Sequence, residues 1–214
     1  MRKIENQLLA RLDRIVEISY EILKGKIVSG GITVQNEASL QLQFGVILKQ
    51  VGTLFEYDAK DSFEIILEEV QDVSTVKSPK GARCDIMLRL CNCRNSAEVT
   101  AAIELKFFKA VDGKTETITQ NRRSVYLDVE NLEEYRTNLG YELVYTNNGN
   151  YPNPDSCSVI RLGDGETMRT INDGTHDVIL ESTYDLKWDC YNEAGEACKD
   201  YDKRGDFFLL IQVK

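Results

Sequence analysis

Long apolar runs, histidine and paired cysteines are all scarce in this sequence, and each scarcity excludes a class of protein. No stretch approaches the roughly 18 consecutive apolar residues of a transmembrane helix, so no membrane span is expected. The one histidine, His176, lies among polar turn residues, which favours a surface histidine over a catalytic base. A glycine-rich phosphate loop of Walker type, a serine nucleophile elbow and the zinc-protease signature are also absent.

The six cysteines contain no C-x-x-C pair. Cys91 and Cys93 fall at the end of an expected strand, beside a turn. Reduced, structural thiols are therefore expected, with a zinc site as the lesser alternative.

Positive charge is in short supply as well. The 26 lysine and arginine residues face 35 aspartate and glutamate residues, for a net charge of −9. This balance argues against a protein that coats nucleic acid non-specifically, so any contact with DNA depends on a local basic surface. The candidates for that surface are Lys77, Lys80, Arg83, Lys106, Lys109, Lys114, Arg122 and Arg123.

The length of 214 residues, 42% of them apolar, suits one well-buried core, so residues 1–214 are expected to form a single domain. From Ile4 to Leu23 apolar residues recur at helical spacing among charged ones, which predicts a long amphipathic helix with Gly25 as its stop. Because this segment is unlike a signal peptide, a cytoplasmic protein is expected. The helix packs across the domain or against a second subunit, which leaves a homodimer open.

The chain is organised around a predicted hairpin of two strands, Arg83–Leu90 and Glu98–Phe107. The polar segment Asn92–Ser96 supplies the turn between them. An antiparallel register centred on this turn places Asp85 opposite Glu104. Two carboxylates then meet on one face of the hairpin.

Side chains alternate across a strand, so Glu104 and Lys106 share the face of Asp85. Two like charges at cross-strand distance destabilise a sheet unless a cation lies between them. Carboxylate oxygens are the ligands that a hard divalent cation prefers, and a neighbouring ammonium group stabilises an attacking hydroxide or a developing charge on phosphorus. The hairpin therefore predicts a divalent-metal site suited to phosphoryl chemistry. The opposite face of the second strand carries Ile103, Leu105 and Phe107.

A second helix is predicted from Asn36 to Val51, with Asn36 as its cap and Gly52 as its stop. At 100° per residue, Glu37 projects from the same side as the apolar stripe of this helix. In isolation, Glu37 is a first-turn carboxylate favoured by the helix dipole. The stripe consists of Leu40, Phe44, Ile47, Leu48 and Val51.

Asp85 and the segment Glu104-Leu105-Lys106 resemble the two half-motifs of the PD-(D/E)XK nucleases. The family usually has a proline before the aspartate, where this chain has Cys84. Many members carry an acidic residue on a helix ahead of the core sheet, facing the metal site, and Glu37 matches it in position and orientation. The resemblance covers about residues 36–146. It implies an α/β protein of the restriction-endonuclease-like fold, a mixed β-sheet core flanked by α-helices, here with an extra N-terminal helix and C-terminal strands.

The resemblance also implies an activity, the metal-dependent hydrolysis of DNA phosphodiester bonds, with an endonuclease as the expectation. Mg²⁺, for which Mn²⁺ can substitute, would be held by Asp85, Glu104, the carbonyl of Leu105 and Glu37. Lys106 would orient or stabilise the attacking hydroxide. The predicted substrate contacts are Lys80, Arg83, Lys109, Arg122 and Arg123.

After the hairpin, a helix is predicted from Thr119 to Leu139, closed by Gly140 as a C-terminal cap. The strand Tyr141–Thr146 should then lie parallel to the strand of Glu104, because a strand, helix, strand unit crosses over in a right-handed sense. Further strands are predicted at Thr53–Tyr57, Phe63–Val70, Ser158–Leu162, Val178–Leu180 and Phe207–Val213.

Two other classes of protein stay open. A catalytically inactive module of the same fold that binds DNA or a protein partner suits the acidic net charge. The third class is a structural protein whose first helix mediates dimerisation and in which Asp85 or Glu104 forms a buried salt bridge. A metal titration separates these from the enzyme.

Overall fold

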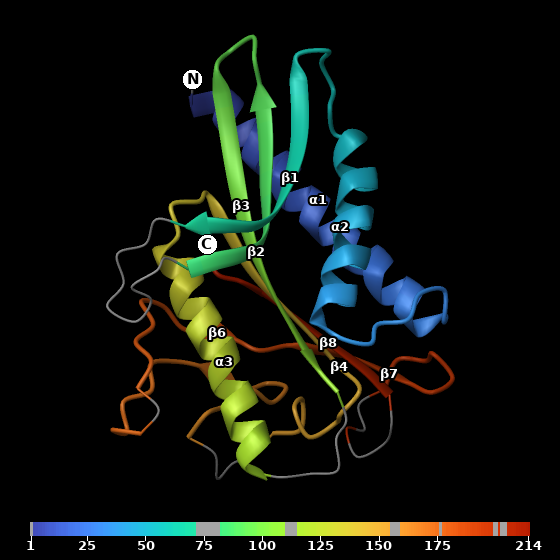
Figure 1. Cartoon of the computed structure of the whole chain (residues 1–214), viewed down its shortest axis with the longest axis vertical. Coiled ribbons are helices and arrows are strands. Elements are labelled where there is room, and N and C mark those ends of the chain that lie inside the picture. The colour runs from blue at the N-terminus through green and yellow to red at the C-terminus, as the bar shows by residue number, and fades with distance from the viewer. Residues whose placement is uncertain are drawn as a thin grey trace.

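The computed structural model describes residues 2–71, 82–109, 115–154, 159–175, 177–198, 201 and 205–214 (Figure 1). Within these residues a six-stranded sheet has the order β1-β2-β3-β4-β8-β7, and β5 and β6 form a separate pair. β3 and β4 are parallel, and the other neighbours in the large sheet are antiparallel. The strands are β1 (Asp61–Gln71), β2 (Ala82–Asn92), β3 (Ala97–Phe108), β4 (Leu139–Thr146), β5 (Thr167–Met168), β6 (Tyr184–Asp185), β7 (Trp188–Asn192) and β8 (Gly205–Gln212).

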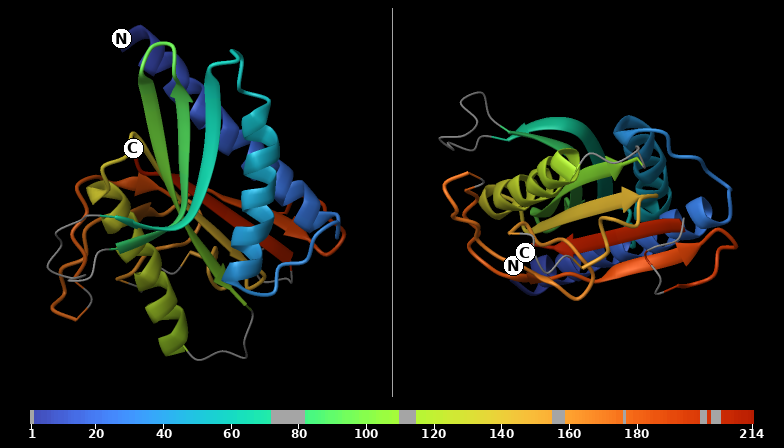
Figure 2. Two further views of the ribbon diagram at one scale, coloured as in Figure 1. Left: turned by 45° about the horizontal axis from the view of Figure 1, so that its top comes forward. Right: turned by 90° about the horizontal axis from the view of Figure 1, so that it is seen from below.

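Helices cover both faces of the large sheet, which makes the protein a mixed α/β structure (Figure 2). α1 (Arg2–Val28) and α2 (Glu37–Thr53) pack on the face that carries the side chains of Ile103 and Leu105. α3 (Thr115–Glu134) packs on the opposite face. None of the described helices is both long and apolar enough to cross a membrane.

α1 is longer than its pattern predicted, and the predicted stop at Gly25 is wrong. The helix continues to Val28 because Ile27 is still buried in the core beneath it. Gly30 then adopts a φ of +72°, a left-handed conformation that glycine tolerates and that commonly follows a helix.

α2 begins and packs as predicted. The Asn36 side chain accepts a hydrogen bond from the Ser39 amide at 2.8 Å, and the Ser39 hydroxyl accepts one from the Asn36 amide at 3.1 Å, which closes a capping box. The strand predicted at Thr53–Tyr57 is wrong, because Thr53 belongs to α2 and the following residues form a turn. Asp61 holds this turn by accepting hydrogen bonds from the amides of Tyr57 and Asp58. The predicted apolar stripe of α2 is buried: Leu40, Phe44, Ile47, Leu48 and Val51.

The central hairpin has the predicted register. β2 and β3 pair from Asn92–Ala97 to Ile86–Ile103, so the next positions along the strands are Asp85 and Glu104. The parallel pairing of β3 with β4 is also confirmed.

The end of α3 was predicted wrongly. α3 ends at Glu134, and Leu139 and Gly140 belong to β4. Gly140 is a strand residue that accepts a hydrogen bond from the Val213 amide at 2.8 Å, so it does not cap the helix.

In the last third, β8 confirms the strand predicted at Phe207–Val213 to within two residues. The segment 159–162 is not a strand, and Val178 forms only an isolated bridge with Ile171. The expectation of reduced thiols is wrong for Cys190 of β7 and Cys198, which form a disulfide.

Candidate functional site

The candidate site lies where β2 separates from β3. β2 stays paired with β1 as far as Ala82, but its pairing with β3 ends at Ile86. Opposite Asp85, Glu68 of β1 has a φ of +56°, an uncommon conformation for a residue with a side chain. Figure 1 shows the ends of β1 and β2 turning across the C-terminal part of α3, and Cys84 shares a buried cluster with Leu132 of that helix and with Tyr135 just after it. Beyond Ile103, this edge of β3 has no strand partner among the described residues.

Two carboxylates accept hydrogen bonds from the backbone amides of this free edge. Asp85 Oδ2 accepts a hydrogen bond from the Leu105 amide at 2.8 Å. Glu37, at the start of α2, accepts one from the amide of Phe107. Because alternate residues of a strand present their amides to the same edge, these two carboxylates follow one another along β3.

The side chains of Asp85 and Glu104 meet as the register predicted. The two carboxyl groups lie close enough for each to affect the pKa of the other. Glu104 is 4% exposed, and its Oε1 accepts a hydrogen bond from the Tyr135 hydroxyl at 2.6 Å. The site therefore contains a carboxyl pair that is largely shielded from water.

A third carboxyl group lies beside this pair. Glu142 of β4 is the direct neighbour of Glu104 in the parallel ladder. It is 0% exposed, and neither of its carboxyl oxygens has a hydrogen-bond partner. A buried ionised carboxylate without a partner is costly, so this position calls for a proton or a cation.

Lys106 supplies the positive charge of the cluster. Its ammonium group forms an ion pair with Asp128 of α3, and both side chains are less than one-fifth exposed. A longer contact, 3.4 Å, joins Lys106 Nζ to the carbonyl oxygen of Leu105. Lys106 therefore lies between α3 and the free edge of β3.

The charges of the cluster do not balance. Burial raises the pKa of Asp85, and it raises the pKa of Asp128 to about 6 and that of Glu104 to about 9. The pKa of Glu142 rises well above its ordinary value, first through burial and then through Asp128. With Glu37, five carboxyl groups among the described residues thus surround the ammonium group of Lys106. Additional positive charge, from protons or a metal ion, would stabilise this end of β3.

The donor set suits a hard divalent cation in its chemistry. Asp85, Glu104, Glu37 and the Leu105 carbonyl all offer oxygen, and the unpartnered Glu142 marks a local excess of negative charge. Across the part of the chain that the structure describes, no three His, Cys, Asp or Glu side chains are already arranged to hold a metal ion. Binding a cation here would therefore require the carboxylates to converge.

The residues predicted to contact the substrate differ in their exposure to solvent. Arg83 on β2 is exposed two residues from Asp85, Lys109 is exposed after the far end of β3, and Arg123 is half-buried on α3. Arg122 is 3% exposed, and its guanidinium group donates to the carbonyl oxygen of Asn150 at 3.0 Å. The predicted phosphate contact of Arg122 is therefore wrong: the helix turns it inward against the C-terminal region. Lys80 lies outside the described residues.

Sequence reasoning missed Asp128 and Glu142. At helical spacing, Asp128 falls on the same apolar face of α3 as Val125, Val129 and Leu132. That spacing directs its carboxylate toward the sheet. Glu142 interrupts an otherwise apolar strand that was already predicted to lie beside Glu104. A carboxylate on a buried face was the signal in both cases.

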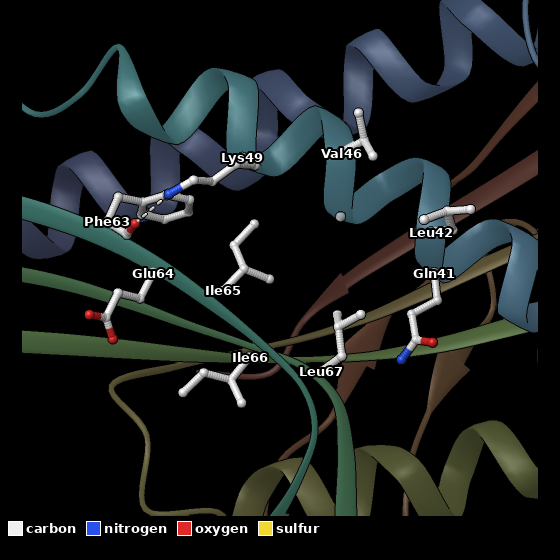
Figure 3. A pocket seen from close by; sticks show the side chains of 10 residues that line it. Gln41, Leu42, Val46, Lys49, Phe63, Glu64, Ile65, Ile66 and Leu67 are labelled. Carbon is white, nitrogen blue, oxygen red and sulfur yellow. Dashed lines mark hydrogen bonds between the residues drawn. The ribbon is translucent and has the colours of Figure 1, made fainter.

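An apolar groove of about 520 Å³ adjoins the site between α2 and β1 (Figure 3). Gln41 lies at one end, where its amide group donates to the carbonyl oxygen of Asp85 at 2.8 Å and to Glu68 at 3.1 Å. At the other end Lys49 donates to the carbonyl oxygen of Phe63 at 2.9 Å. Gln41 thus ties α2 to the fork.

Comparisons with known proteins gave no match. The chain fits no protein-family model, and searches of curated proteins and of solved structures found no significant similarity.

Proposed function

We propose that the protein is a metal-dependent nuclease that hydrolyses DNA phosphodiester bonds, with a restriction-endonuclease-like core. The observation that carries this proposal is the meeting of Asp85 with Glu104-Leu105-Lys106 at the fork between β2 and β3. The order of elements supports it, since an antiparallel hairpin, a helix and a parallel strand follow one another as that fold requires.

Each residue of the site has a proposed role. Asp85, Glu104, the Leu105 carbonyl and Glu37 would hold Mg²⁺ or Mn²⁺, which supplies Lewis-acid stabilisation of the phosphate and a more acidic bound water. Lys106 stabilises negative charge that grows on the phosphate as the bond to the attacking oxygen forms. Arg83, exposed on β2 close to Asp85, and Lys109, exposed after the end of β3, contact the DNA backbone.

The charge state of Lys106 limits its role. Burial by itself lowers the pKa of Lys106, but Asp128, ahead of Glu142 and Glu37, raises it above the ordinary value for lysine. A lysine that stays protonated cannot accept a proton from the attacking water. It can donate hydrogen bonds to the water or to a phosphate oxygen.

The test is incubation with supercoiled plasmid and with end-labelled linear DNA, with Mg²⁺, with Mn²⁺ and with EDTA. The proposal expects cleavage that needs the metal. Nicked and linear plasmid would indicate an endonuclease, whereas loss of the end label alone would indicate an exonuclease. A parallel arm with single-stranded RNA tests the substrate class. Intact substrates in every arm, with protein shown to be folded by thermal melting, would contradict the proposal.

A second candidate is a module of the same fold that binds without cleaving. Two observations favour it: the ammonium group of Lys106 is already paired with Asp128, and the carboxylates are not preassembled around a metal position in the described part of the chain. Metal-independent retention of DNA in a mobility-shift assay, without any cleavage, would select this candidate.

A further inference from the structure

The ion pair between Lys106 and Asp128 joins the proposed site to a helix that carries none of its motif residues. Asp128 is on the inner stripe of α3, between Val125 and Leu132, both of which are fully buried. Neighbouring packing therefore restricts where the carboxylate of Asp128 can go. A lysine side chain has four rotatable bonds, so its ammonium group needs such a partner to stay in one place.

The surroundings of Lys106 offer it several competing partners. Glu37, Asp85, Glu104 and Glu142 are all close enough to act on it electrostatically. Three of these are the carboxylates proposed to hold the metal ion. If the ammonium group moved onto these carboxylates, it would neutralise the negative charge that attracts the metal ion.

We propose that Asp128 is a positioning residue, which holds the Lys106 ammonium group away from the metal-binding carboxylates and directs its free N–H toward the phosphate. This inference rests on the proposed nuclease function. The ammonium group has three N–H bonds, of which one meets Asp128 and one points to the Leu105 carbonyl oxygen at 3.4 Å. The third meets no acceptor among the described residues, so it is left for the substrate or the attacking water.

Replacing Asp128 with asparagine should affect both Mn²⁺ affinity and kcat. The change keeps the size of the side chain but removes the charge that holds Lys106. We expect Asp128→Asn to weaken Mn²⁺ binding about tenfold, because the freed ammonium group competes for the carboxylates, and to lower kcat by about tenfold to a hundredfold, because a displaced catalytic group costs rate steeply. A structural role alone would lower the melting temperature and leave both quantities unchanged per folded molecule.

The test is a double-mutant cycle on the full chain, with Mn²⁺ affinity measured by calorimetry and kcat by plasmid cleavage. The four proteins are the wild type, Asp128→Asn, Lys106→Ala and the double variant. If Asp128 acts through Lys106, then Asp128→Asn has little further effect on either quantity in the Lys106→Ala background. An Asp128→Asn effect of the same size in both backgrounds would overturn the inference, as would Asp128→Asn protein with wild-type affinity and kcat.

A control comes from the same helix. Glu130→Gln removes a carboxylate that holds the Ile179 amide at 2.9 Å, and it should change the melting temperature without changing Mn²⁺ affinity or kcat. The same experiments distinguish failure of the nuclease proposal from failure of the role proposed for Asp128. Wild-type protein that binds Mn²⁺ but leaves DNA intact contradicts the nuclease, while the comparison of Mn²⁺ affinities between wild type and Asp128→Asn still decides the role of Asp128.

Discussion

On one face of β3, Ile103 and Leu105 are fully buried against α1 and α2, and on the other face Glu104 and Lys106 lie among Asp85, Asp128 and Glu142. The same strand therefore carries an apolar core on one side and buried charge on the other. Apolar burial stabilises the fold, whereas a buried excess of carboxylates destabilises it. The charged face therefore lowers the stability of the fold, and the proposed metal site would account for its presence.

Substitutions on the apolar face should change the stability of the fold without changing the cleavage rate of the folded protein. Ile103→Ala should lower the free energy of unfolding by about 2–5 kcal/mol, because the side chain is 0% exposed and its loss leaves a cavity. Cleavage per folded molecule should stay at the wild-type value, since the carboxylates lie on the other face. Urea denaturation and active-fraction-corrected rates measure both. A hundredfold loss of rate in folded Ile103→Ala protein would break the comparison.

The charged face should behave in the opposite way. Lys106→Ala should lower the cleavage rate by a hundredfold or more, because charge stabilisation is largest in the transition state, while the protein still folds and binds metal. Lys49→Ala is the matched control, a lysine whose ammonium group meets the Phe63 carbonyl outside the site. Rate and melting temperature should be measured on the same preparation. Near-wild-type turnover by folded Lys106→Ala would exclude the proposed mechanism.

The two carboxylates on the free edge of β3 should contribute unequally to the cleavage rate. Asp85→Asn should lower the rate about a hundredfold, because Asp85 accepts the Leu105 amide and lies beside Glu104 at the centre of the fork. Glu37→Gln should cost about tenfold, since Glu37 reaches the site from α2 and is exposed. Steady-state cleavage at saturating Mn²⁺ gives the ranking. A greater loss for Glu37→Gln would reverse the assignment of the central ligand.

The hairpin could be predicted from the sequence because its register depends on local features. The turn near Asn92 and strict alternation along β3 are enough to bring Asp85 to Glu104. The fork could not be predicted, because it depends on the contact of Cys84 with Leu132 and Tyr135 of a later segment. The burial of Arg122 depends in the same way on the C-terminal region, which supplies the carbonyl groups that it meets.

The last prediction concerns the pH dependence of stability. The pKa of Glu104 is raised from 4.5 to about 9, first by burial and then by Asp128, so between these pH values the folded state holds a proton that the unfolded state has lost. The free energy of unfolding should therefore fall as the pH rises from 4.5 to about 9. Glu104→Gln should flatten the profile of melting temperature against pH. The exposed Glu98→Gln is the control and should leave it unchanged. A profile that rises over this range would contradict the burial of an uncompensated carboxyl group.

Calorimetric titration of Mn²⁺ tests the central claim most directly, namely that the charged face of β3 exists to bind a divalent cation. The prediction is saturable binding at millimolar Mn²⁺ or below by the wild type, retained in Lys106→Ala and lost in Asp85→Asn, with a melting temperature that rises as the site fills. The absence of binding by folded wild-type protein at millimolar Mn²⁺, both alone and with a DNA duplex present to supply phosphate oxygens, would contradict that claim.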